Sequence, residues 1–360
     1  MNKRNSSARF EIIRTAVAVA IAMLAAVVII FSVSEEPVNA LYNFIIGPFT
    51  SLRRIGNVIE MACPFIFTAL AVCVMFQANQ FSMIAEGSFF FGALCAAVAA
   101  IKLPEITGLS PIIALLIGTV AGGILGAIPG FFKAKWKTDE FVISLMLNYV
   151  ALYFSLYLMN LLIRDASAGS KVSEKFQDSF QLINLIPGTR VHMGVILSIL
   201  MIIIVYVFLY HNRWGYQLRM AGCNIKFAQY SGINTFAVIL GSQIIGGCIA
   251  GLGGAVEMLG IYNRFQWTSL PNYGFDGITV AIIAKKSPKL VPIAALFLAY
   301  LRIGADIMSR SSDVPSEVIS VIQSLVIVLI AANSFLSGFR HRMLVKESMK
   351  KPMVEGGNEA

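Results

Sequence analysis

The chain has 360 residues, of which 57% are hydrophobic and 13% are charged, and its mean hydropathy is +0.77. Soluble domains carry about 25% charged residues, so this composition excludes an ordinary soluble protein and predicts an all-α polytopic membrane protein. The formal net charge of +9 is dispersed between apolar runs. That pattern favours basic cytoplasmic loops over a nucleic-acid-binding surface, so we expect no nucleic-acid partner.

Cysteines and histidines give no sign of a metal or redox centre. The five cysteines form no close CxxC pair, and the three histidines fall at the edges of predicted spans. We therefore expect no metal site and no cofactor bound by this chain. The sequence also lacks the strings GxxxxGK[ST], GxSxG and HExxH, which favours a chain that is not itself an enzyme.

The chain opens with basic residues that predict a cytoplasmic N-terminus over residues 1–11 and a first span at about residues 12–33. Residues 34–60 contain prolines and the pair Arg53-Arg54, so we expect an amphipathic segment at the outer face there.

Two short spans are predicted within Cys63–Ile101, separated by a polar interruption at residues 77–88. This interruption includes Asn79 and Glu86, and a carboxylate at membrane depth costs about 2.5–3.5 kcal/mol on insertion scales. Either it is a short cytoplasmic turn in which Glu86 caps the next helix, or it lines a cavity. Both interpretations stay open at this point.

The next two spans are expected at about residues 111–132 and 138–163. Gly118, Gly122 and Gly126 form a GxxxGxxxG face in the first of them, which predicts close approach of another helix. Thr138 is the expected N-cap of the second, with Asp139 and Glu140 in its first turn. Asn148, inside this span, is either a helix–helix contact or a pore-lining amide.

A long polar loop at residues 164–191 is predicted outside, where it could touch an extracytoplasmic binding protein. A sixth span at about residues 192–210 then leads to a basic island at residues 211–234, between two long apolar runs. Its apolar residues recur at steps of three and four, which predicts a short amphipathic helix. Such an island either sets orientation only or docks a cytoplasmic partner.

The last third of the chain contains a glycine-rich span at about residues 236–259 and an apolar run after Asn272 that is too short to cross a bilayer. Roughly 20 residues are needed for a helical crossing, so a half-helix or broken helix is expected there. Two further spans follow at about residues 290–307 and 316–335. The map therefore has about ten segments within a transmembrane domain at residues 12–336.

The tail at residues 337–360 is expected in the cytoplasm, like the N-terminus. With this orientation about twice as many Lys and Arg residues lie inside as outside, as the positive-inside rule requires.

The basic island resembles the cytoplasmic coupling segment of bacterial ABC-importer permeases of the ribose/nucleoside type. The matching residues are Trp214, Gly215, Leu218, Arg219, Gly222, Asn224, Ala228, Gly232, Ile233 and Asn234. TDEFVISLMLNYVA and YGFDGITVAII are also similar to segments of that family. Near Glu86, the sequence departs from the family at Ser82, Ile84 and Ser88.

This resemblance implies the permease subunit of an importer for nucleosides or simple sugars in a bacterial cell membrane. It implies a separate cytoplasmic ATPase, a second permease subunit and an extracytoplasmic substrate-binding lipoprotein. The expected ATPase-coupling residues are Trp214, Gly215, Arg219, Gly222, Asn224, Ala228 and Gly232. The expected substrate-pathway residues are Asn79, Glu86, Asn148, Tyr273, Asp276 and Gln323, because amides and carboxylates pair with hydroxyls and aromatic rings stack on bases.

Two other functions fit the same residues. In an ion- or proton-coupled secondary transporter, Glu86 and Asp276 would be titrating groups within the membrane. A membrane scaffold or enzyme subunit would show no uptake defect on deletion. ATP dependence of uptake separates the first two, and the sequence leaves open which solute is carried and whether two identical permeases pair.

Overall fold

A computed structural model of the chain describes residues 24, 27, 28, 31, 36–105, 108–312, 321 and 324. The chain divides into two units, residues 1–43 with 308–360, and residues 44–307. In the first unit, side-chain hydrogen bonds link Asn39 to Glu36 and Asn43 to Asn39, one helical turn apart each. Most of the predicted first and last spans, and Gln323, lie outside the described residues.

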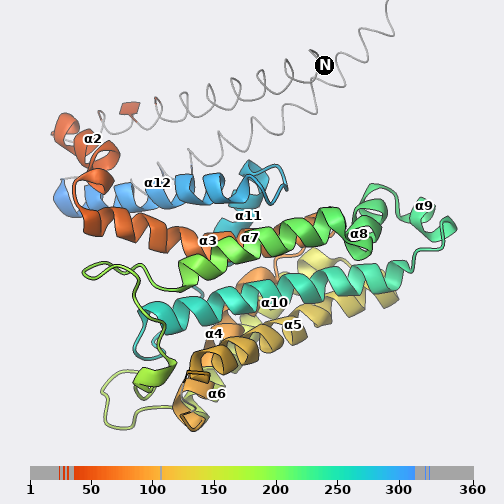
Figure 1. The fold of residues 1–360 in the computed structure, drawn as a ribbon, viewed down its shortest axis with the longest axis horizontal. Coiled ribbons are helices and arrows are strands. Elements are labelled where there is room, and N and C mark those ends of the chain that lie inside the picture. Colours follow the sequence, from red (N-terminus) through yellow and green to blue (C-terminus); the bar gives the residue numbers. More distant parts are fainter. Residues whose placement is uncertain are drawn as a thin grey trace, which may run out of the picture. The chain divides into compact units, whose positions relative to one another are not determined.

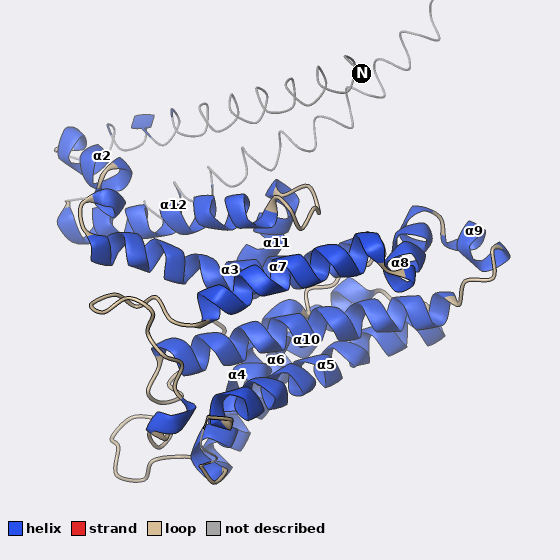
Figure 2. Ribbon diagram, in the orientation of Figure 1, coloured by secondary structure: helices blue, strands red, loops and turns tan. Residues whose placement is uncertain are grey.

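Among these residues the fold is helical, with two isolated β-bridges and no longer strand (Figure 2). In chain order the elements are α2 (Pro37–Ile45), η1 (Gly47–Phe49), α3 (Leu52–Gln77), α4 (Ala85–Lys102), α5 (Ser110–Trp136), α6 (Glu140–Leu162), η2 (Asp178–Phe180), α7 (Gly194–His211), α8 (Arg213–Cys223), α9 (Ile225–Tyr230), α10 (Thr235–Ile261), α11 (Tyr273–Ile283) and α12 (Val291–Ser311).

Seven of the described helices are long and apolar enough to cross a membrane, namely α3, α4, α5, α6, α7, α10 and α12. The helix α11 is apolar but has only 11 residues, which matches the predicted half-helix. The expected all-α membrane fold is therefore confirmed. The expected count of about ten segments stays a prediction.

The helix α3 begins earlier than the sequence indicated. A span from Cys63 was expected, but α3 starts at Leu52 and includes Arg53 and Arg54 in its first turn. The side chain of Ser51 caps this end, and the Arg54 guanidinium donates to the Thr50 hydroxyl at 2.7 Å. Because the arginine is satisfied by the residues just before the helix, it does not prevent the helix from starting there.

Helices α4, α5 and α10 pack backbone to backbone, and Figure 1 shows α5 running alongside α10. A methyl group added at Gly251 would lie 2.5 Å from the Gly118 carbonyl oxygen, and one at Gly92 would lie 2.5 Å from the Gly251 carbonyl oxygen. A methyl group at Gly122 would likewise meet the backbone of Gly247. The predicted GxxxGxxxG face is therefore confirmed as a close helix–helix contact.

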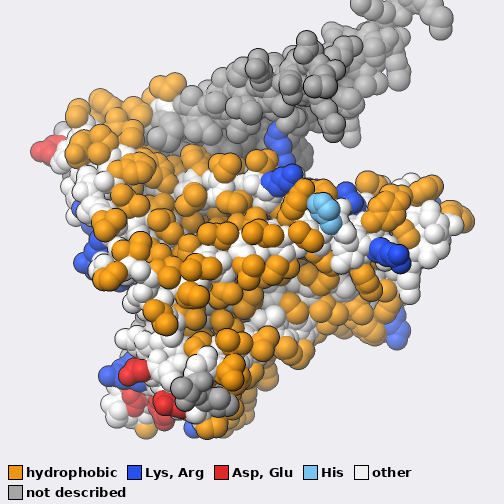
Figure 3. Space-filling view, in the orientation of Figure 1, with side chains coloured by type: hydrophobic (Ala, Val, Ile, Leu, Met, Phe, Trp, Pro, Cys, Tyr) orange, Lys and Arg blue, Asp and Glu red, His pale blue; other side chains and the backbone are white. Residues whose placement is uncertain are grey.

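Helices α6 and α7 expose apolar surface. Along α7 the side chains of Ile199 and Ile203 are 53% and 56% exposed, and along α6 Tyr153 is 68% exposed. Figure 3 shows an apolar face over α7 and α10, with charged side chains gathered toward its two ends. Such a surface suits lipid or another membrane subunit rather than water.

The N-cap of α6 is Asp139, whose carboxylate accepts from the Phe141 N–H at 2.9 Å. Thr138 was the expected cap, and this prediction is off by one residue, because the helix begins at Glu140 and the cap lies directly before it. The two isolated β-bridges, Arg164–Ser173 and Asn184–His192, lie in the polar loop between α6 and α7.

Candidate functional site

An extended segment at residues 78–84 joins α3 to α4 and is held along one face of α6. Three polar residues of α6 bind its backbone and the start of α4. The Glu140 carboxylate accepts from the Phe81 N–H at 3.1 Å, and the Ser144 hydroxyl accepts from the Met83 N–H at 2.9 Å. Glu140 also pairs with Lys133 at 2.7 Å.

The third of these residues is Asn148, which is 1% exposed. Its amide nitrogen donates to the Met83 carbonyl at 2.9 Å, and its amide oxygen accepts from the Gly87 N–H at 2.9 Å. Residues 140, 144 and 148 are four apart and so lie on one face of the helix. Non-helical backbone at membrane depth must find such partners within the protein.

Glu86 lies in the first turn of α4, and its side chain is fully buried. Its two carboxylate oxygens accept from the backbone N–H groups of Asn272, at 2.7 Å, and Gly274. The carboxylate therefore caps the N-terminus of α11, where a negative charge is favourable. One expectation was that Glu86 caps its own helix, whereas its carboxylate binds the N-cap residue of another helix, 186 residues further along the chain.

The other end of α11 is tied to α3. The Gln77 amide donates to the Lys286 carbonyl at 3.1 Å, just after α11 ends. Lys285 and Lys286 adopt left-handed backbone conformations, with φ of 52° and 59°. The half-helix is thus held at its start by α4 and at its end by α3.

Along its length, α11 carries two further polar contacts. Asp276 pairs with Arg302 of α12, and the Arg302 guanidinium lies 5.8 Å from the Phe65 ring centroid. The Tyr273 hydroxyl donates to the Glu257 carboxylate of α10 at 3.4 Å.

The basic island forms two helices rather than the single amphipathic helix expected. Asn224 ends α8, and its side chain accepts from the Lys226 and Phe227 N–H groups at the start of α9. An asparagine whose amide caps the following helix explains the break. Ala228 is buried, and Gly232 has a φ of +79° in the turn after α9.

Helix α8 packs against the end of α3. Gly222 lies within α8, where its Cα faces the Gln77 carbonyl so closely that no side chain would fit. Gly215 packs in the same way against the carbonyl groups of Phe208 and Leu209. The Arg219 guanidinium lies 5.0 Å from the Tyr210 ring centroid.

Two recesses flank α8, each of about 490 Å³. One lies between α8, the end of α3 and the end of α11, and is lined by Asn79, Arg219 and Lys286 among others. The other lies between α8 and α9. Around them Trp214 is 48% exposed and Tyr230 is 92% exposed.

The predicted pathway residues therefore separate into distinct places. Glu86, Tyr273 and Asp276 come together around the first turn of α11. Asn148 holds the backbone before α4, and Asn79 lies in the recess beside α8. The role of these residues in the solute pathway stays a prediction.

Several residues of this arrangement were not predicted from the sequence. Arg302 and Glu257 are the charged partners of α11, and Gln77 fixes its end. A lone arginine in an otherwise apolar span was a usable signal for Arg302, since such a charge needs a partner. Within the described residues, no group of three or more His, Cys, Asp or Glu side chains could hold a metal ion.

Comparisons with known proteins place this arrangement in a family. Residues 54–331 match the family described as branched-chain amino acid transport system / permease component. The glucose ABC transporter permease protein TsgB13 of Haloferax volcanii is 30% identical over 325 residues, covering 87% of this chain and 85% of that protein. No solved structure matches.

Two further relatives are nucleoside permeases by name. The guanosine ABC transporter permease protein NupP of Bacillus subtilis is 31% identical over 301 residues, covering 82% of this chain and 85% of that protein. The nucleoside ABC transporter permease protein NupB of Lactococcus lactis subsp. cremoris is 27% identical over 327 residues, covering 88% of this chain and 89% of that protein. The chain therefore belongs to this permease family, and it is the membrane permease subunit of an ABC importer.

Proposed function

We propose that this permease imports nucleosides or simple sugars, and that a separate cytoplasmic ATPase drives it by moving α8 and α9. The relatives that support this solute class are named for glucose, guanosine and nucleosides. The observation that supports this mechanism most directly is the way in which α11 is bound to α4 and to α3. This half-helix is bound at both ends, and one of the two ends meets the segment against which α8 packs.

The route of coupling is short. A displacement of α8 reaches Gln77 through the close contact at Gly222, and Gln77 holds Lys286, in the turn after α11. At the other end α11 is held by Glu86 on α4, which belongs to the closely packed helices. A push at α8 therefore tilts α11 about its N-terminus, a rigid-body movement rather than local chemistry.

The surface offered to the ATPase is formed by α8 and α9. It combines exposed aromatic side chains, Trp214, Tyr216, Phe227 and Tyr230, with the recess between the two helices. Aromatic residues are favoured at the centres of protein interfaces, and a recess accepts a protruding side chain of the partner. Arg219 is half-buried and Ala228 is buried, so these two residues shape the surface from below, whereas Asn224 is exposed between the two helices.

In the proposed assembly the chain lies in a bacterial cell membrane with α8, α9, residues 1–11 and residues 337–360 in the cytoplasm. The loop at residues 164–191 faces outside, toward a substrate-binding lipoprotein. A second permease, identical or related, covers part of the exposed apolar face. The solute passes near α11, where Tyr273 and Asp276 offer an aromatic ring and a carboxylate.

The side of the membrane on which α8 lies can be tested with a thiol that the protein already has. Cys223 is exposed at the end of α8, whereas the other four cysteines are buried or half-buried. A membrane-impermeant maleimide should label Cys223 in inverted membrane vesicles and leave it unlabelled in intact cells. A matched control is Gly169→Cys, because a side chain at Gly169 meets open space in the 164–191 loop. The control thiol should label from outside in intact cells, and external labelling of Cys223 would overturn the mechanism.

The energy source is tested by uptake of labelled guanosine, uridine and glucose into right-side-out vesicles loaded with ATP. We expect uptake to require ATP and to survive a protonophore. Uptake that persists without ATP and collapses with the protonophore would establish the secondary transporter instead.

A further inference from the structure

A recess at the opposite end of α10 from α8 has no role in the mechanism above. Its volume is about 330 Å³, within the range of roughly 300–1,000 Å³ that small-molecule sites occupy. It is formed by two segments, the loop before α7 and the end of α10 with the residues after it. The lining residues are Asn184, Thr189, Arg190, Gly260, Ile261, Tyr262 and Gln266.

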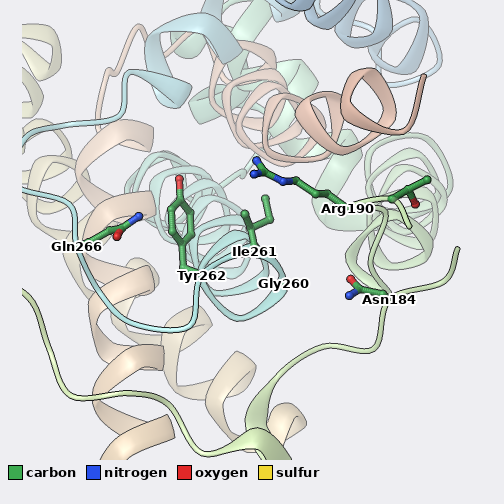
Figure 4. Close-up of a pocket in the computed structure, with 7 residues that line it drawn as sticks. Asn184, Arg190, Gly260, Ile261, Tyr262 and Gln266 are labelled. Atoms are coloured by element: carbon green, nitrogen blue, oxygen red, sulfur yellow. The ribbon is translucent and has the colours of Figure 1, made fainter. Parts of the chain in front are cut away.

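The polar side chains of this recess face one another across the end of α10. Figure 4 shows Arg190 reaching across Ile261 toward the side on which Tyr262 and Gln266 lie, with Asn184 on the opposite side. Within the described part of the chain, the side chains of Asn184, Arg190 and Gln266 form no hydrogen bond of their own. The guanidinium and the two amides supply several hydrogen-bond donors and acceptors, which suits a solute with several hydroxyl groups.

An aromatic wall completes the recess. The Tyr262 ring lies 5.5 Å from the Trp267 ring centroid, nearly perpendicular to it, and Trp267 is 9% exposed. Burial raises the pKa of the Tyr262 phenol above its ordinary value, and the Glu257 and Glu60 carboxylates act in the same direction, against the Trp267 indole and the Arg190 guanidinium. The phenol is therefore neutral at physiological pH and can donate a hydrogen bond.

Charged groups are few around the recess. Glu257 lies one turn before Gly260 and Ile261 on α10, is 1% exposed, and has one carboxyl oxygen without a hydrogen-bond partner. Glu60 of α3 is 6% exposed and lies within electrostatic reach of Arg190. Burial disfavours the charged form of both carboxyl groups, so Arg190 is the charged side chain among the residues that line the recess.

We propose that this outer recess, formed by Asn184, Arg190, Tyr262 and Gln266, binds a polyhydroxylated solute before it passes inward. The hydroxyl groups bond to Arg190 and the amides, and the Tyr262 ring lies against the sugar or base. This inference rests on the proposed function, because it assigns a site on the path of the same solutes.

The test uses the complete importer reconstituted in nanodiscs, first without its binding protein. Equilibrium dialysis measures binding of labelled guanosine, with unlabelled guanosine as competitor. We expect Arg190→Gln and Tyr262→Ala each to weaken guanosine binding at least fivefold.

Lys171→Gln is the matched control, since Lys171 is an exposed cation of the same loop that does not line the recess. It should bind guanosine like the unaltered importer. Arg190 and Lys171 are both exposed, so both variants should retain the thermal stability of the parent, which is measured in parallel.

The outcomes separate the two proposals. If the unaltered importer takes up no nucleoside or sugar in the vesicle assay, the proposed function fails and this inference with it. If uptake occurs but Arg190→Gln and Tyr262→Ala bind guanosine normally, only the recess is wrongly assigned. If Arg190→Gln instead reduces co-purification of the binding protein and leaves guanosine binding intact, the recess is a protein contact and the inference is overturned.

Discussion

Two helices of this permease, α4 and α11, each follow non-helical backbone, but their starts are secured differently. The segment before α4 is bound at four backbone groups by Glu140, Ser144 and Asn148 of one long helix. The start of α11 is bound by one carboxylate, that of Glu86. The first arrangement fixes a helix along a line, whereas the second holds it at a point about which it can tilt.

The largest effect on stability and uptake is expected from removing the Glu86 carboxylate, which alone binds the start of α11. Glu86→Ala leaves two backbone N–H groups unpaired, and hydrogen bonds to charged groups are worth about 1.5–3 kcal/mol each. We expect a loss of at least about 3 kcal/mol in folding free energy and a more than tenfold loss of uptake, measured by thermal unfolding and vesicle transport. Glu86→Gln, which keeps one acceptor oxygen in place, should fall between Ala and the parent, and equal losses for both would argue against the capping role.

Substitution of Asn148 should destabilise the protein less than substitution of Glu86. Asn148→Ala removes two of four backbone contacts, and an unsatisfied buried polar group costs about 1–3 kcal/mol. We expect about 2 kcal/mol of destabilisation, with uptake reduced in proportion to the amount of folded protein. A loss of uptake at normal protein level would instead place Asn148 in the solute pathway.

Releasing the far end of α11 should affect coupling more than stability. Gln77→Ala removes one partly exposed neutral hydrogen bond, which is worth about 0.5–1.5 kcal/mol. We expect ATP hydrolysis to continue while uptake per ATP falls several-fold, measured in proteoliposomes. Unchanged coupling would show that the movement does not pass through this contact.

The smallest change in stability is expected at Asp276, because its ion pair with Arg302 is partly exposed and such pairs contribute about 0–1 kcal/mol. Asp276→Asn should reduce uptake at normal protein level. The double variant Asp276→Asn with Arg302→Gln should regain stability, since no charge is left unpaired. Loss of the protein in the single variant would identify Asp276 as structural.

The sequence predicted those features that depend on neighbouring residues. The length of the apolar run after Asn272 predicted the half-helix, and the spacing of Gly118, Gly122 and Gly126 predicted a close helix contact. The break at Asn224 was missed, although an asparagine before a helix is a usable capping signal.

Contacts between distant segments could not be predicted in this way. Nothing near Glu86 in the sequence indicates that its partners are the N–H groups of Asn272 and Gly274. The same holds for Arg302, whose need of a partner was foreseeable but whose pairing with Asp276 depends on how α11 and α12 pack. Helix packing decides both pairings, and the residues near Glu86 or Arg302 in the sequence do not show which distant segment packs against them.

The close packing of α4, α5 and α10 has a consequence for the transport cycle. Carbonyl oxygens there occupy the space that a methyl group would need, as between Gly251 and Gly118. Because these three helices touch backbone to backbone, we expect them to move as one body. A change between outward and inward access would then be carried by the helices around them.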